Sequence, residues 1–289
     1  MFFLQEVRGE SMIRTTTGTV VAALGMTLAL ITPITRAGPT AEEIVGKAYA
    51  INGGDDSTSR LTFDLHKADG SERKLVYTMA WKKYPPGSDV SNKVIFFNEY
   101  PPDDKGKSYM IWVSADRKKQ DDEWMYLPEL RMVRKITHDQ SHRHKDKEDD
   151  FARSLLTQTN LVPRNPELDE HKLLHEEPLN GHNDYVVESM PKRIDKLYPY
   201  SKTRRWITKD NFLPERIDYY GGNGKVELQQ SFKWKNIGDA WVWERVVAVS
   251  PPTGDKTVLD ISDIRLNNHL SDEVFSSRSM RLGKDSLMQ

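Results

Sequence analysis

Segments of alternating apolar and polar residues, separated by short turns, constrain the fold of this sequence more than any other feature. Residues 61–65, 73–83, 93–100 and 107–114 each carry large apolar side chains at every second position. Side chains of a β-strand point alternately to its two faces, so this period of two is typical of strands. Clusters of proline, glycine, aspartate and serine lie between the segments, as in tight turns. The pattern predicts a meander of antiparallel strands rather than a β-α-β succession.

The alternation is interrupted in the middle of the chain and then returns. Residues 138–177 lose it; we expect a charged loop there, then a short helix at 151–161 and a loop with a weak helical turn at 162–174. Six more strands are predicted at 183–190, 201–209, 213–220, 225–237, 239–250 and 255–267. With the segment 124–136, the coarse prediction is about ten to twelve strands in one domain.

Helices are predicted mainly near the two ends of the alternating region. Residues 39–50 form an amphipathic pattern that Thr40 and Glu43 can open as a capping box. Residues 270–277 predict a helical turn that tucks Val274 and Phe275 under the sheet. We expect the helices to cover one face of the sheet and solvent to cover the other.

The first 37 residues have the features of an export signal. Met12 begins a short positive start, residues 18–31 form an apolar run, and residues 35–37 resemble a small-x-small cleavage site. We therefore predict a signal peptide over residues 1–37, with Met12 as the true start and cleavage after Ala37, and a single periplasmic domain over residues 38–289. The alternative is an uncleaved N-terminal anchor.

Composition excludes several classes of function. The sequence contains no cysteine, which excludes thiol catalysis and cysteine-ligated metals. The net charge of −1 argues against a nucleic-acid binder, which would show a large positive excess. The glycine-rich residues 221–224 join two predicted strands, so they indicate a hairpin turn rather than a phosphate-binding loop.

Histidines offer the one pattern compatible with a metal site. His138, His142 and His144 lie close together, and His171 and His175 have the i, i+4 spacing of one helix face. Basic residues lie among the first three, which disfavours a cation, so we expect no metal and no cofactor. No paired carboxylates lie in an apolar setting, and we expect no enzymatic activity.

Aromatic residues are concentrated in the predicted strands, several of which carry bulky apolar residues on both faces. A thick ordinary core is one interpretation. The other is a curved sheet whose concave face holds an acyl chain, since each buried methylene contributes about 0.8 kcal/mol. Four methionines, at positions 79, 110, 125 and 132, would suit an adaptable lining.

The segment WMYLPELRMVRKI, residues 124–136, resembles a characteristic motif of the outer-membrane lipoprotein-sorting protein family. Residues 196–220, 224–232 and 263–276 support the resemblance, which covers essentially all of residues 38–289. Members of this family are relatives of the periplasmic lipoprotein carrier and of the outer-membrane lipoprotein receptor. Residues 144–161 depart from the family pattern, because only Asp150 and Phe151 match it.

The resemblance implies an open, unclosed antiparallel β-barrel of about eleven strands, with helices plugging its concave face beside a hydrophobic cavity. It implies a carrier of lipid acyl chains or lipoproteins across the periplasm toward the outer membrane, working without chemistry. We expect a monomer, because hydrophobicity is low outside the predicted strands. An inner-membrane exporter of the resistance-nodulation-division type and an outer-membrane acceptor are the implied partners. The alternative function is a docking or sensing subunit of such an exporter assembly.

On this basis we predict an apolar ligand-binding lining and a rim. Arg131 and Arg134 would contact head groups or a partner at the rim, or else only serve solubility on an outer strand face. The predicted lining comprises Trp81, Phe96, Trp112, Trp124, Tyr126, Leu127, Trp206, Phe232, Trp241 and Trp243.

Overall fold

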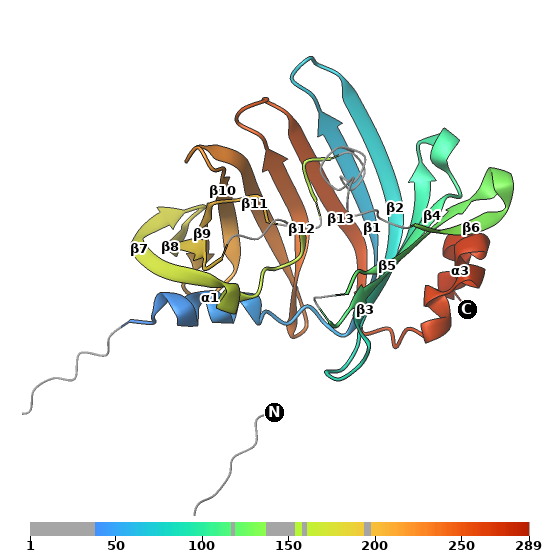
Figure 1. Ribbon diagram of the computed structural model, residues 1–289, viewed down its shortest axis with the longest axis horizontal. Helices are drawn as coiled ribbons and strands as arrows, with labels where there is room; N and C mark the ends of the chain where they lie inside the picture. Colours follow the sequence, from blue (N-terminus) through green and yellow to red (C-terminus); the bar gives the residue numbers. More distant parts are fainter. Residues whose placement is uncertain (1–37, 117–118, 137–153, 158–160, 194–197, 289) are drawn as a thin grey trace, which may run out of the picture. The chain divides into compact units, whose positions relative to one another are not determined.

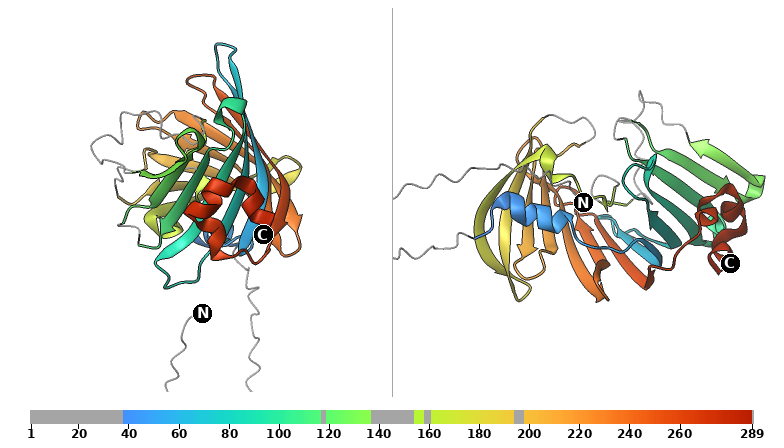
Figure 2. Two further views of the ribbon diagram at one scale, coloured as in Figure 1. Left: turned by 90° about the vertical axis from the view of Figure 1, so that its right-hand side faces the viewer. Right: turned by 90° about the horizontal axis from the view of Figure 1, so that it is seen from below.

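A single antiparallel sheet dominates the computed structural model, which describes residues 38–116, 119–136, 154–157, 161–193 and 198–288. Its strands follow the order β6-β5-β4-β3-β2-β1-β13-β12-β11-β10-β9-β8-β7, so β6 and β7 are its two edges (Figure 1). The sheet is curved, and its edges do not pair with each other (Figure 2). The strands are β1 (Asp56–His66), β2 (Glu72–Lys83), β3 (Val90–Tyr100), β4 (Ser108–Ser114), β5 (Asp122–Leu127), β6 (Met132–Ile136), β7 (Asp169–Leu179), β8 (His182–Pro191), β9 (Lys202–Thr208), β10 (Pro214–Tyr220), β11 (Val226–Ile237), β12 (Ala240–Val249) and β13 (Lys256–Leu266).

The prediction of a mainly β chain with a large open antiparallel sheet is confirmed, but the implied number of about eleven strands is wrong. The described residues form thirteen strands. The strand missed from the sequence is β7, where we expected a loop and a weak helical turn. A register shift between Leu173 and His175 breaks its alternation, and Pro178 lies near its end. Irregular register and proline are both common in edge strands, because they discourage pairing with another chain.

The predicted helical face of His171 and His175 is therefore also wrong. His171 contacts Ser189 through Nδ1 at 2.8 Å, while Nε2 of His175 lies 3.0 Å from a carboxylate oxygen of Glu177. No group of three or more metal-ligating side chains occurs among the described residues. His138, His142 and His144 lie outside the described residues, as does the predicted signal peptide.

The predicted N-terminal helix is confirmed as α1 (Ala41–Tyr49). The Thr40 hydroxyl accepts a hydrogen bond from the Glu43 amide, and the Glu43 carboxylate accepts one from the Thr40 amide. Ile44 and Val45 of α1 pack against Tyr185, Val187 and Ile207 at the β7–β9 end of the sheet. Within the part of the chain that the structure describes, no helix is long and apolar enough to cross a membrane.

The C-terminal residues cover the opposite face of the sheet. The predicted helical turn is confirmed as the 3₁₀ turn η5 (Asp272–Phe275), with Val274 and Phe275 buried, and it continues into α3 (Ser277–Leu282) and η6 (Gly283–Met288). The shorter 3₁₀ turns are η1 (Pro102–Asp104), η2 (Pro128–Leu130) and η4 (Pro166–Leu168).

Strand pairing shows that α1 and α3 lie on different faces. Ile95 packs beneath α3, and its neighbour Phe96 points to the other face of β3. Strand pairing relates the face of Phe96, one strand after another, to that of Val187, which packs beneath α1. The prediction that the helices cover only one face of the sheet is therefore wrong. Figure 2 places α3 on the outer, convex side of the curved sheet. Among the described residues, α1 is the one helix on the concave face, and it covers only one end of that face. The predicted plug of several helices is therefore not found in this part of the chain.

A buried carboxylate attaches the C-terminal segment to the start of β1. Asp56 is 4% exposed, and its two carboxylate oxygens accept hydrogen bonds from the amides of Asn268 and Leu270, at 2.6 and 3.0 Å. These two bonds fix the direction in which the chain leaves β13 before η5 begins.

Asp56→Ala should lower the free energy of unfolding by about 2–4 kcal/mol, because it leaves two amides without their charged acceptor. Chemical denaturation measures the loss, and hydrogen exchange at residues 268–270 should accelerate. Asp55→Ala is the matched control, because the Asp55 side chain is 80% exposed and, among the described residues, forms its ion pair with the exposed Lys83. Equal stability of the two variants would contradict this role for Asp56.

Candidate functional site

A continuous apolar surface covers the concave side of the sheet, and we call it the inner face. Phe63 of β1 lies opposite Leu259 of β13, which lies opposite Val246 of β12, which lies opposite Phe232 of β11. Residues directly opposite one another in an antiparallel pair point to the same face. One side of five neighbouring strands, from β2 to β11, is therefore apolar. The buried members of this cluster are Leu61, Phe63, Leu65, Leu75, Tyr77, Phe96, Leu156, Tyr219, Leu228, Phe232, Val246, Ala248 and Leu259.

Aromatic rings form two groups on the inner face. Tyr77 makes edge contacts with Phe63 and Phe96, with ring centroids 6.0 and 6.3 Å apart. Phe232 lies 5.4 Å from Trp243, and the half-buried rings of Trp234 and Trp243 are 6.0 Å apart. Large, rigid rings of this kind provide contact area at little cost in side-chain entropy.

Residues 154–157 pack against the inner face. The Leu155 amide donates a hydrogen bond to Oγ1 of Thr257 at 3.1 Å, and Leu156 is fully buried within the inner-face cluster. Residues 154–157 are not assigned to a helix, whereas Leu161, at the end of the predicted helix 151–161, is helical, and its amide donates a hydrogen bond to the Thr157 carbonyl at 3.0 Å. The other residues of that prediction lie outside the described residues. Apolar cover here thus comes from a non-helical segment, residues 154–157.

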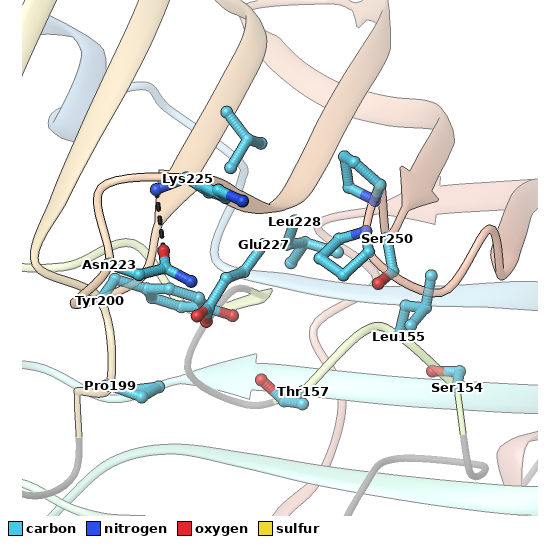
Figure 3. Close-up of a pocket in the computed structure, with 13 residues that line it drawn as sticks. Ser154, Leu155, Thr157, Pro199, Tyr200, Asn223, Lys225, Glu227, Leu228 and Ser250 are labelled. Atoms are coloured by element: carbon cyan, nitrogen blue, oxygen red, sulfur yellow. Dashed lines mark hydrogen bonds between the residues drawn. The ribbon is translucent and has the colours of Figure 1, made fainter.

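A cavity of about 890 Å³ lies where this segment approaches the ends of two hairpins (Figure 3). We call it the rim cavity. Leu155, Tyr200 and Leu228 belong both to its lining and to the inner-face cluster, so the cavity wall continues into the apolar surface. The lining residues are Ser154, Leu155, Thr157, Pro199, Tyr200, Asn223, Lys225, Val226, Glu227, Leu228, Ser250, Pro251 and Pro252.

The glycine-rich turn at 221–224 shapes one wall of the rim cavity. It is a hairpin turn, as predicted: the Gly221 amide donates to the Lys225 carbonyl, and Gly224 has a φ of +74°. A Cβ at Gly221 would overlap the carboxylate of Glu227, so only glycine allows that side chain to lie against the turn. The sequence pattern located this turn but gave no sign that it borders a cavity.

Tyrosines form the polar end of the inner face. The hydroxyl of buried Tyr219 donates to Oε1 of the fully buried Gln230 at 2.8 Å. Tyr200 lies between Tyr219 and Tyr198, at ring distances of 4.7 and 5.5 Å, and the Arg164 guanidinium lies 4.0 Å from the Tyr198 ring. Burial raises the pKa of Tyr198 to about 12 and also raises the pKa of Tyr219, which keeps both phenols neutral near pH 7.

Six of the ten predicted lining residues lie on the inner face. Phe96, Phe232 and Trp243 belong to its cluster or pack against it. Trp81 follows Met79 on the same side of β2, Trp241 precedes Trp243 on β12, and Leu127 follows Met125, which lies opposite Tyr109.

The other four predicted lining residues lie on the outer face. Trp112, Trp124 and Tyr126 pack against the C-terminal cluster of Leu270, Phe275 and Met280, and the rings of Trp112 and Trp124 are 5.1 Å apart. Trp206 is buried, and its ring is covered by the Arg216 guanidinium at 4.3 Å. The structure separates the predicted lining into two groups that one ligand on the inner face cannot contact together.

The two predicted rim arginines occupy the β5–β6 hairpin. Arg131 follows η2 in a left-handed conformation with a φ of 49°, and Arg134 lies opposite Met125 on edge strand β6. Both residues are exposed, and their contact with a head group or partner stays a prediction.

Comparison with known proteins agrees with this architecture. A family model described as "Uncharacterized protein"-like matches residues 90–282, and the chain belongs to that family. No curated protein matches the sequence. The structure of a DUF1329 family protein from Desulfovibrio piger is 23% identical, with a TM-score of 0.70 over 83% of this chain and 97% of that chain.

Two further solved structures share the fold. A protein domain from Vibrio parahaemolyticus, described as outer membrane lipoprotein-sorting, is 23% identical with a TM-score of 0.68, and the match covers 83% of this chain and 98% of that one. A LolA superfamily protein from Nitrosomonas europaea is 20% identical with a TM-score of 0.57, covering 83% and 99% of the two chains. The resemblance to the outer-membrane lipoprotein-sorting family is thereby confirmed in the fold.

Sequence reasoning missed a buried carboxyl group on the outer face near the β7–β8 hairpin. Asp184 is fully buried, and neither of its carboxylate oxygens has a hydrogen-bond partner among the described residues. Burial, and secondarily the carboxylates of Glu215 and Glu177, raise its pKa to about 6, although His182 acts in the opposite direction. The polar residues around Asp184 in the sequence gave no sign of this burial.

Asp184→Asn should stabilise the protein at pH 8 by an amount of the order of 2 kcal/mol, and have little effect near pH 4. The folded state holds the Asp184 proton up to about pH 6, whereas the unfolded state releases it near 3.8, so this group lowers stability as pH rises through that window. Denaturation of both proteins at several pH values measures the difference. A difference that is constant with pH would contradict the raised pKa.

Proposed function

We propose that this protein is a periplasmic carrier that holds the acyl chains of a lipid or lipoprotein on its inner face and delivers them toward the outer membrane. The observation that carries the proposal is an apolar inner face that continues into a rim cavity of about 890 Å³. Concave apolar sites of this size with a few polar groups are typical of small-molecule binding sites. The shared fold with lipoprotein-sorting proteins supports the same function.

In this proposal the ligand contacts the inner-face members of the predicted lining. Trp81, Phe96, Phe232, Trp241 and Trp243 form this part of the lining, together with Leu127 nearer the β6 edge. The outer-face tryptophans Trp112 and Trp124 act in stability instead, because the C-terminal residues already cover them.

Binding follows from burial, without a covalent step. A chain that buries about six methylenes against the inner face would gain about 5 kcal/mol, enough to offset part of the cost of association. Export by way of the predicted signal peptide over residues 1–37 would place the protein in the periplasm. A monomer that exchanges its cargo between an inner-membrane donor and an outer-membrane acceptor completes the proposal.

Native mass spectrometry of protein purified from the periplasm without detergent tests the proposal directly. We expect a stoichiometric acyl-containing adduct that organic extraction removes. A ligand-free mass, together with no uptake of added phospholipid or lipopeptide, would contradict the carrier function and favour the docking or sensing alternative.

Leu155→Trp should weaken binding of a fluorescent fatty acyl probe roughly tenfold, because filling the rim cavity displaces about two methylenes at about 0.8 kcal/mol each. Titration of the probe measures the change. The control is Leu130→Trp, an equal enlargement at a residue that is 61% exposed and belongs to no apolar cluster. Trp124→Ala should lower stability and leave probe affinity unchanged; the reverse pattern would place the ligand on the outer face.

A further inference from the structure

The rim cavity carries two opposite charges that no described residue neutralises. The Lys225 ammonium group and the Glu227 carboxylate have no hydrogen bond or ion pair with any residue that the structure describes, although both line the cavity. Figure 3 shows the Glu227 carboxylate beside Tyr200, while Lys225 lies at the end of the hairpin turn, just before β11 begins at Val226. The position of the carboxylate is specific, because Gly221 provides the space for it.

The local backbone places these two charges in different settings beside the cavity. Lys225 lies in the bend just before β11, whereas Glu227 is the extra residue of a bulge, between Val226 opposite Tyr220 and Leu228 opposite Tyr219. Elsewhere in the sheet lysines pair with carboxylates across strands, as Lys233 does with Glu244 at 2.7 Å and Lys202 with Glu188 at 2.8 Å. The rim cavity is thus a place where a cation and an anion face the same space without neutralising each other.

We propose that the rim cavity binds the zwitterionic head group of an aminophospholipid, an inference that rests on the carrier function proposed above. Lys225 contacts the phosphate, and Glu227 contacts the ammonium group, which also lies against the Tyr200 ring. A carboxylate and an aromatic ring are the two groups that attract an ammonium ion most strongly in proteins. The acyl chain passes Leu155 and Leu228 onto the inner face.

The geometry distinguishes a zwitterion from other head groups. An anionic head group without an ammonium group gains from Lys225 but is repelled by Glu227. A neutral head group gains from neither charge and depends on its chain alone. The cavity opens to solvent, so each charge contributes modestly, as exposed ion pairs do.

The test uses three single-chain probes with the same acyl chain and different head groups: lysophosphatidylethanolamine, lysophosphatidylglycerol and a neutral monoacylglycerol. In wild-type protein, the zwitterionic probe should bind most tightly. Glu227→Gln should weaken only the zwitterionic probe, by roughly two- to fivefold. Lys225→Gln should weaken both phosphate-containing probes by a similar factor and leave the neutral probe unchanged.

Matched controls are Glu170→Gln and Lys235→Gln, which remove the same charges from exposed strand positions remote from the rim cavity. Neither should change the ranking of the three probes. Free phosphoethanolamine should compete poorly, because the acyl chain supplies most of the affinity; strong competition would overturn the assignment to a lipid.

Two failures are distinguishable. If the neutral probe binds but Glu227→Gln leaves the affinity of the zwitterionic probe unchanged, the head-group assignment is wrong and the carrier function stands. If none of the three probes binds, the carrier function itself is wrong.

Discussion

The pairing of β1 with β13 is the constraint on which the rest of the structure depends. It joins the beginning of the folded region to its end, with Leu61 opposite Ile261 and Phe63 opposite Leu259. Without it, β1–β6 and β7–β13 would be two separate sheets, each with one more unpaired edge. The same pairing places Asp56 beside the residues that follow β13, where its carboxylate directs the C-terminal segment onto the outer face.

The outer and inner faces of the sheet are covered in different ways as a result of this arrangement. Strands β3–β5 carry bulky apolar residues on both faces, so both faces need cover. On the outer face the cover is intramolecular, because Phe275 and Met280 fill the space beside Trp112, Trp124 and Ile95. On the inner face, residues 154–157 and α1 supply described cover for only part of the surface. The inner face is therefore where an external apolar ligand can bury surface.

Local pattern predicted the strands better than it predicted the site. The alternation of apolar and polar residues predicted twelve of the strands. It failed at β7, because the register shift and the edge position of that strand remove the period of two. Alternation also indicates correctly that Trp124 and Met125 face opposite ways. It does not indicate which side is concave, because that depends on where the distant segment 267–288 packs. Trp124 and Tyr126 of the motif at 124–136 consequently pack against the C-terminal segment, which the local pattern does not indicate.

The rim cavity, like the concave side of the sheet, could not be predicted from local sequence pattern. Its walls come from residues 154–157, 199–200, 223–228 and 250–252, which are far apart in the sequence and meet only in the folded sheet. Each of these segments reads as an ordinary turn or loop by itself. Their convergence at one end of the apolar surface has a physical consequence, because an amphipathic molecule lowers its free energy most when its chain is buried and its head stays hydrated. A cavity that is apolar toward Leu228 and charged toward Lys225 satisfies both requirements at once, which an enclosed apolar core could not.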